Sequence, residues 1–96
     1  MKCVIFELDG VLRDIDDNAI AGNVSLAKSL YSAGHDVLIM RAKDAYEWLK
    51  KNDVCYDDIM TSHQQIDADR VAMAVVSDDV IYAAMRNAGI HCWLYK

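Results

Sequence analysis

The chain has 96 residues, of which 54% are apolar, and this is enough for one small hydrophobic core and a single domain over residues 1–96. Its formal net charge of −5, from 15 acidic and 10 basic residues, argues against nonspecific binding to nucleic acid, which requires a surface rich in lysine and arginine. No apolar run approaches the roughly 18 residues of a membrane span, and the start MKCVIFELDG is unlike a signal peptide, so we expect a cytoplasmic protein without a membrane segment.

The first part of the chain predicts a strand, a helix and a second strand. Residues 2–8, KCVIFEL, are an apolar run typical of a strand that is covered on both faces. An aspartate-rich loop follows, and from Asn23 the spacing of apolar residues predicts a helix that ends at Gly34. Residues 37–40, VLIM, predict a second buried strand, which completes a βαβ unit.

The rest of the chain continues this alternation of strands and helices. We expect a helix at 43–52, a strand at 59–61, a strand at 71–76, a helix at 80–88 that ends at Gly89, and a strand at 90–95. Alternation of this kind predicts an α/β fold with a parallel sheet, a small Rossmann-like three-layer sandwich without a cap domain. Because only about ten residues separate the third and fourth strands, their crossover helix is expected to be reduced to about one turn.

Acidic residues gather where two of the predicted strands end. Glu7 and Asp9 end the first strand, and Asp78 and Asp79 end the fourth. Because ligands of parallel sheets bind at the carboxyl ends of the strands, beside a topological switch point, we expect these carboxylates to meet there. Their mutual repulsion would raise their pKa values unless a divalent cation lay between them, so they are candidate metal ligands.

With FELDG at the first strand and SDDVIYAAMRNAGIHCWLY at 77–95, the sequence resembles the haloacid dehalogenase-like phosphohydrolase superfamily. The closest likeness is to the 3′-phosphatase domain of polynucleotide kinase-phosphatases. In that family an aspartate attacks phosphorus, and a second aspartate two residues later serves as acid and base. The resemblance places Glu7 at the nucleophile position and Asp9 at the acid/base position. It also implies a Mg²⁺ ion, held by Glu7, by Asp9 through its backbone carbonyl, and by Asp78 and Asp79.

Three of the four catalytic elements of that family are altered here. Glu7 replaces the attacking aspartate, and its extra methylene sets the carboxylate oxygens about 1.5 Å further out, which we expect to cost orders of magnitude in rate. Met40 stands where the family has a serine or threonine that donates to the phosphoryl group. The next residue, Arg41, is either a phosphate contact or an exposed arginine. The family's lysine is missing, and Arg70 is the candidate replacement.

The fourth element, the acidic pair, is intact and has two possible roles. Asp78 and Asp79 match the pair that surrounds Mg²⁺ in the family. Alternatively, Asp79 caps the following helix and Asp78 is solvated. We therefore expect Mg²⁺ binding at this site to be weak.

These substitutions favour a degenerate phosphatase-fold protein that is catalytically inactive or severely impaired and acts in binding or regulation, with an unknown protein partner or a phosphorylated ligand. The alternative is an active Mg²⁺-dependent phosphatase of nucleotides or nucleic-acid 3′ ends. A third interpretation is a homo-oligomeric module that pairs along an exposed final strand. The small size would suit an accessory protein of a bacteriophage or a bacterium.

The remaining chemically interesting residues are expected to be structural or solvated. We expect Trp48 and Trp93 to pack in the core. A solvated flap over the site is expected to contain Asp14, Asp16 and Asp17. The cysteines lack CxxC spacing and are expected to be buried free thiols, and the histidines lack metal-ligand spacing: Cys3, Cys55, Cys92, His35, His63 and His91.

Overall fold

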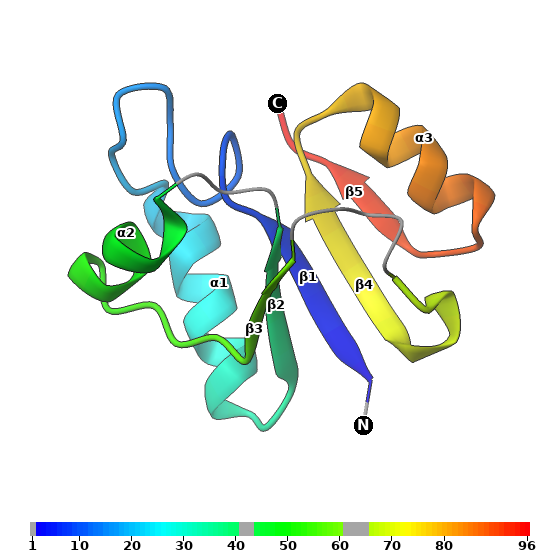
Figure 1. The fold of residues 1–96 in the computed structure, drawn as a ribbon, viewed down its shortest axis with the longest axis horizontal. Coiled ribbons are helices and arrows are strands. Elements are labelled where there is room, and N and C mark those ends of the chain that lie inside the picture. The colour runs from blue at the N-terminus through cyan, green and yellow to red at the C-terminus, as the bar shows by residue number, and fades with distance from the viewer. Residues whose placement is uncertain (1, 41–43, 61–65) are drawn as a thin grey trace.

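The computed structural model describes residues 2–40, 44–60 and 66–96 (Figure 1). The elements in these ranges are β1 (Cys3–Glu7), α1 (Ala21–Ser32), β2 (Asp36–Met40), α2 (Ala45–Lys51), β3 (Asp58–Met60), the 3-10 turn η2 (Ala68–Arg70), β4 (Val71–Val76), α3 (Asp79–Asn87) and β5 (Cys92–Leu94). The five strands form one parallel sheet in the order β3-β2-β1-β4-β5. The predicted α/β class and its parallel sheet are confirmed.

Helices cover both faces of the sheet and enclose two apolar clusters (Figure 1). Val4 and Phe6 of β1 pack in the cluster that also contains side chains of α1 and α2. Ile5, which points to the opposite face because side chains alternate along a strand, packs in the cluster that contains side chains of α3. The β1 strand is therefore buried on both faces, as its continuous apolar run predicted.

The predicted C-terminal ends of the helices agree with the structure more closely than their predicted N-terminal ends. Gly34 and Gly89 follow α1 and α3 with φ of 94° and 83°, in the left-handed conformation that ends many helices. The first helix, however, begins at Ala21 rather than at Asn23. The Asn23 side chain does not cap the helix, because its amide donates a hydrogen bond of 2.8 Å to the carbonyl of Val11.

The loop between β1 and α1 is held by its own hydrogen bonds and by α2. The side chain of Asp14 accepts hydrogen bonds from the backbone of Asp16 and of Asn18, both of 2.9 Å. Trp48 of α2 donates from its indole Nε1 to the carbonyl of Asp17 over 2.8 Å. The aspartates of this loop are exposed, as expected, and the predicted burial of Trp48 is confirmed.

Two predictions of burial are wrong. Trp93 is 64% exposed. It lies on β5 beside Val75, on the face of the sheet that carries α1 and α2. These two helices cover the other half of that face, and no described helix lies above Trp93. Cys55 is exposed in the turn before β3, whereas Cys3 is half-buried and Cys92 is buried. The three cysteines are free thiols, as predicted.

The two described histidines lie at the surface, and the described helices are those of a chain without a membrane-spanning helix in these ranges. His35 and His91 are exposed, and His63 lies outside the described residues. None of the helices in the described ranges has both the length and the apolar composition that a bilayer crossing requires.

Candidate functional site

The candidate site lies at the carboxyl ends of β1 and β4, which are neighbours in the sheet and form its topological switch point. A pocket of about 330 Å³ at this edge is lined by Glu7, Asp9, Ser77 and Asp78. The predicted meeting of carboxylates from the two strands is therefore confirmed for Glu7, Asp9 and Asp78. Asp79 does not line the pocket and instead contacts Lys96, with 3.5 Å between carboxylate oxygen and ammonium.

Glu7 reaches across from β1 to the backbone at the end of β4. Its side chain is 5% exposed, and its Oε1 accepts a hydrogen bond of 2.7 Å from the backbone N–H of Ser77 and a longer one of 3.3 Å from that of Asp78. An aspartate is one methylene shorter and would leave its oxygens further from these donors. The glutamate at this position therefore serves as a connection between the two strands.

Ser77 occupies the space between two groups that the family resemblance assigns to Mg²⁺. Its Oγ lies 3.0 Å from Oε1 of Glu7 and 2.9 Å from the backbone carbonyl oxygen of Asp9. The hydroxyl has one proton, so it donates to one of these acceptors at a time. A neutral side chain thus sits where the resemblance would place a cation.

The close approach of Ser77 depends on the glycine of the LDG motif. Gly10 has φ of 85°, and a Cβ atom on it would lie 2.3 Å from the Oγ of Ser77. Such a distance is far inside van der Waals contact, so a side chain at position 10 would displace Ser77. Gly10 is therefore required both for its backbone conformation and for the space that it leaves.

Asp9 is paired with a cation of the chain itself. The Nε of Arg13 lies 2.6 Å from Oδ1 of Asp9 and 3.7 Å from Oδ1 of Asp17. The Arg13 side chain is only 10% exposed, whereas that of Asp9 is 57% exposed. A tight turn after β1, in which the N–H of Arg13 donates to the carbonyl of Leu8 over 3.0 Å, brings the guanidinium back to Asp9.

The helix cap is Asp78, so the alternative in which Asp79 caps the helix and Asp78 is solvated is wrong. Oδ1 of Asp78 accepts hydrogen bonds from the N–H groups of Val80 and Ile81, at 2.8 and 3.1 Å. Asp78 has the extended backbone of an N-cap residue, and Asp79 is the first residue of α3. A carboxylate at the N-terminus of a helix is also favoured by the helix dipole.

The carboxylates of this pocket each accept hydrogen bonds from donors of the chain itself. Magnesium requires oxygen ligands in near-octahedral geometry, but Oε1 of Glu7, Oδ1 of Asp9 and Oδ1 of Asp78 each already accept from donors of the chain. Within the described ranges, no three side chains of His, Cys, Asp or Glu are grouped so that they could hold a metal ion. Weak Mg²⁺ binding at this site stays a prediction.

The other predicted site residues lie elsewhere or outside the described ranges. Met40 is fully buried at the end of β2 in the cluster beneath α3, where its thioether cannot donate to a ligand. Arg41 lies outside the described residues.

Arg70, the candidate replacement for the family's lysine, lies far from Glu7. Arg70 immediately precedes β4, and the next residue, Val71, pairs with Cys3 at the start of β1. Glu7 is at the other end of β1, about 13 Å away along a strand of this length. Arg70 therefore lies at the opposite edge of the sheet and cannot offset the charge of Glu7.

Ser77 and Arg13 are the two site residues that the motifs alone did not identify. A serine directly before the acidic pair and an arginine four residues after Asp9 are the signals that were available. Neither is distinctive without the register that sets β1 beside β4.

No family model and no curated protein matches the chain. The likeness to the haloacid dehalogenase-like superfamily therefore rests on the motifs and their placement.

Proposed function

We propose that this protein is a degenerate haloacid dehalogenase-like domain with little or no phosphatase activity, and that it acts as a binding or regulatory protein. The observation that supports this most strongly is the engagement of the carboxylates at the switch point. Glu7 is bonded to the end of β4, and Asp9 is paired with the buried Arg13. Both residues at the positions needed for chemistry thus have a structural partner.

Each of these contacts opposes a step of the family reaction. An attacking carboxylate oxygen must point in line at phosphorus, and Oε1 of Glu7 is instead directed at the N–H and hydroxyl of Ser77. An acid/base residue must reach the leaving oxygen within hydrogen-bond distance, and Oδ1 of Asp9 is held 2.6 Å from Arg13. The buried Met40 provides no donor for a phosphoryl group.

A protein partner is a better match to the charge than a phosphorylated ligand. Three acidic side chains and one serine line the candidate pocket, and the chain as a whole has a net charge of −5. A phosphate group would be repelled there unless a cation bridged it. We therefore favour binding of a protein over binding of a phosphate ester.

Phosphate release with Mg²⁺ tests this proposal. Aryl phosphates, nucleotides and 3′-phosphorylated oligonucleotides would be incubated with the purified wild type, and with Asp9→Asn as the control that removes the acid/base carboxylate. We expect both proteins to release phosphate at the background rate. Turnover by the wild type that Asp9→Asn abolishes would instead establish the alternative, a Mg²⁺-dependent phosphatase.

The Glu7→Asp variant tests whether the substitution at the nucleophile position alone accounts for the proposed loss of activity. It restores the family residue, but it leaves Met40 in place and Asp9 paired with Arg13. We expect no measurable gain of turnover, because groups that act together in catalysis are not restored one at a time. A clear gain would mean that the rest of the site is competent, and the proposed loss of function would then reside in Glu7 alone.

A further inference from the structure

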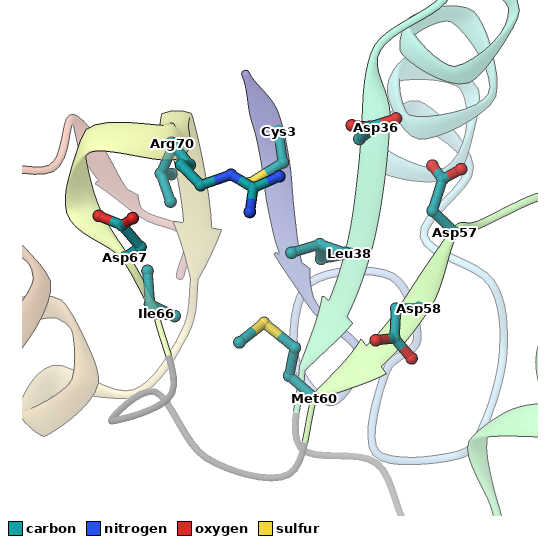
Figure 2. Close-up of a pocket in the computed structure, with 10 residues that line it drawn as sticks. Cys3, Asp36, Leu38, Asp57, Asp58, Met60, Ile66, Asp67 and Arg70 are labelled. Carbon is teal, nitrogen blue, oxygen red and sulfur yellow. The ribbon is translucent and has the colours of Figure 1, made fainter. Parts of the chain in front are cut away.

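A second pocket, of about 400 Å³, lies on one face of the sheet and extends from the starts of β1, β2 and β4 to Met60 at the end of β3 (Figure 2). Its floor comes from three adjacent strands, with Cys3 on β1, Leu38 on β2 and Met60 on β3. All three side chains are only half-buried, and they lie on the face of the sheet that α3 covers over β4 and β5. The pocket therefore exposes apolar surface in the middle of a sheet face.

Within the described residues, no α-helix from the connection between β3 and β4 lies over this floor. In an α/β sandwich that connection normally contributes a helix to this face. Here the described part of the connection, residues 66–70, contains only the 3-10 turn η2. The opposite face, over the same strands, is covered by α1 and α2.

Negative charge is concentrated on one side of this pocket. Asp36, Asp57 and Asp58 lie on the β2–β3 side, as Figure 2 shows, and within the described part of the chain none of them forms an ion pair. Across the pocket lie Asp67 and Arg70, and the Arg70 side chain extends toward Cys3. An excess of three negative charges therefore remains beside the apolar floor.

We propose that this pocket docks an amphipathic helix of a partner protein, which inserts large apolar side chains over Leu38 and Met60 and sets lysine or arginine side chains against Asp36, Asp57 and Asp58. A helix is the element that completes a sheet face, and the acidic side of the pocket selects basic residues at the margin of its apolar stripe. This inference names the surface and the partner class for the proposed binding function, and it rests on that function.

A synthetic peptide tests the inference with the full chain. The probe is a helical peptide of roughly 14 residues, about four turns, with leucines on one face and lysines beside them. Its two controls are a peptide of the same composition in scrambled order and a peptide with glutamate in place of lysine. Fluorescence anisotropy should show binding of the amphipathic lysine peptide and at least tenfold weaker binding of both controls.

Two matched double variants distinguish binding at this pocket from nonspecific attraction of a basic peptide to an acidic protein. In Asp57→Asn/Asp58→Asn the charges are removed, but both side chains keep an oxygen that can accept their present hydrogen bonds, from Val37 N at 2.7 Å and Ile59 N at 2.8 Å. Asp14→Asn/Asp16→Asn makes the same change of charge in the loop between β1 and α1. We expect the pocket variant to weaken binding by roughly three- to tenfold and the loop variant to leave it unchanged.

Cys3 provides a readout at the floor of the pocket. Burial raises the pKa of its thiol above the ordinary value, so alkylation is measured at mildly alkaline pH. Bound peptide should protect Cys3 from N-ethylmaleimide and leave the exposed Cys55 reactive. Protection of both or of neither, or equal weakening by the two double variants, would overturn the inference.

Phosphate release measured on the same proteins distinguishes failure of the docking pocket from failure of the proposed loss of catalysis. Peptide binding together with rapid hydrolysis would refute the loss of catalysis and leave the docking pocket standing. Absence of both binding and hydrolysis would refute the docking pocket and leave the loss of catalysis standing.

Discussion

The carboxylate of Glu7 connects two strand ends that are 70 residues apart in the sequence. Hydrogen bonds to a buried charged acceptor are among the stronger polar interactions in proteins, and an N–H that loses its acceptor in a buried place is costly. Glu7 therefore contributes to the stability of the fold by joining the ends of β1 and β4.

Truncation of this connection should lower stability in a graded way. Glu7→Ala leaves the N–H groups of Ser77 and Asp78 without their acceptor, so we expect its free energy of unfolding to fall by about 2–4 kcal/mol. Ser77→Ala removes only the hydroxyl and should cost about 1 kcal/mol. Urea unfolding followed by circular dichroism measures both, with the exposed Asp16→Ala as a control expected within about 0.5 kcal/mol of the wild type. Equal stability of Glu7→Ala and the control would contradict this role of Glu7.

At the scale of elements, the turn between β1 and α1 decides how closely Ser77 approaches the site. Sequence patterns predicted the strand and the aspartate-rich loop, because a buried strand requires a continuous apolar run and a loop tolerates aspartate. They did not predict that Arg13 folds back onto Asp9. That contact depends on the path of the turn and not on the composition of the loop.

A pair of glycine substitutions tests the packing of this turn. Gly10→Ala places a methyl group 2.3 Å from the Oγ of Ser77 at a φ of 85°, so we expect a loss of stability of at least about 2 kcal/mol. Gly22→Ala, in α1, meets no atom within 4 Å and should raise stability by about 0.5–1 kcal/mol. Thermal unfolding distinguishes the two directions. A neutral Gly10→Ala variant would mean that Ser77 does not need its present position.

At the scale of the whole molecule, each face of the sheet is covered over one half by the described helices. On one face α1 and α2 lie over β1, β2 and β3, and on the other α3 lies over β4 and β5 (Figure 1). The element order could be predicted from the sequence, but the coverage of each face depends on where the crossovers run. That is why Trp93 was predicted to be buried although it is 64% exposed.

The candidate site at the ends of β1 and β4 could likewise be predicted only in part. The convergence of Glu7, Asp9 and Asp78 followed from the rule that parallel strands share their carboxyl edge. The partners of these carboxylates could not be predicted, because hydrogen bonds between strand ends depend on register and on distances of tenths of an ångström. Pairing of the exposed final strand between copies of the chain stays a prediction.

A crystal structure of the wild type grown with MgCl₂ tests the claim that the chain itself satisfies the carboxylates at the switch point. We predict that Ser77 Oγ stays within hydrogen-bond distance of Glu7 and of the Asp9 carbonyl, and that Arg13 stays on Asp9. A cation about 2.1 Å from oxygens of Glu7, Asp78 and the Asp9 carbonyl, with Ser77 displaced, would contradict the claim.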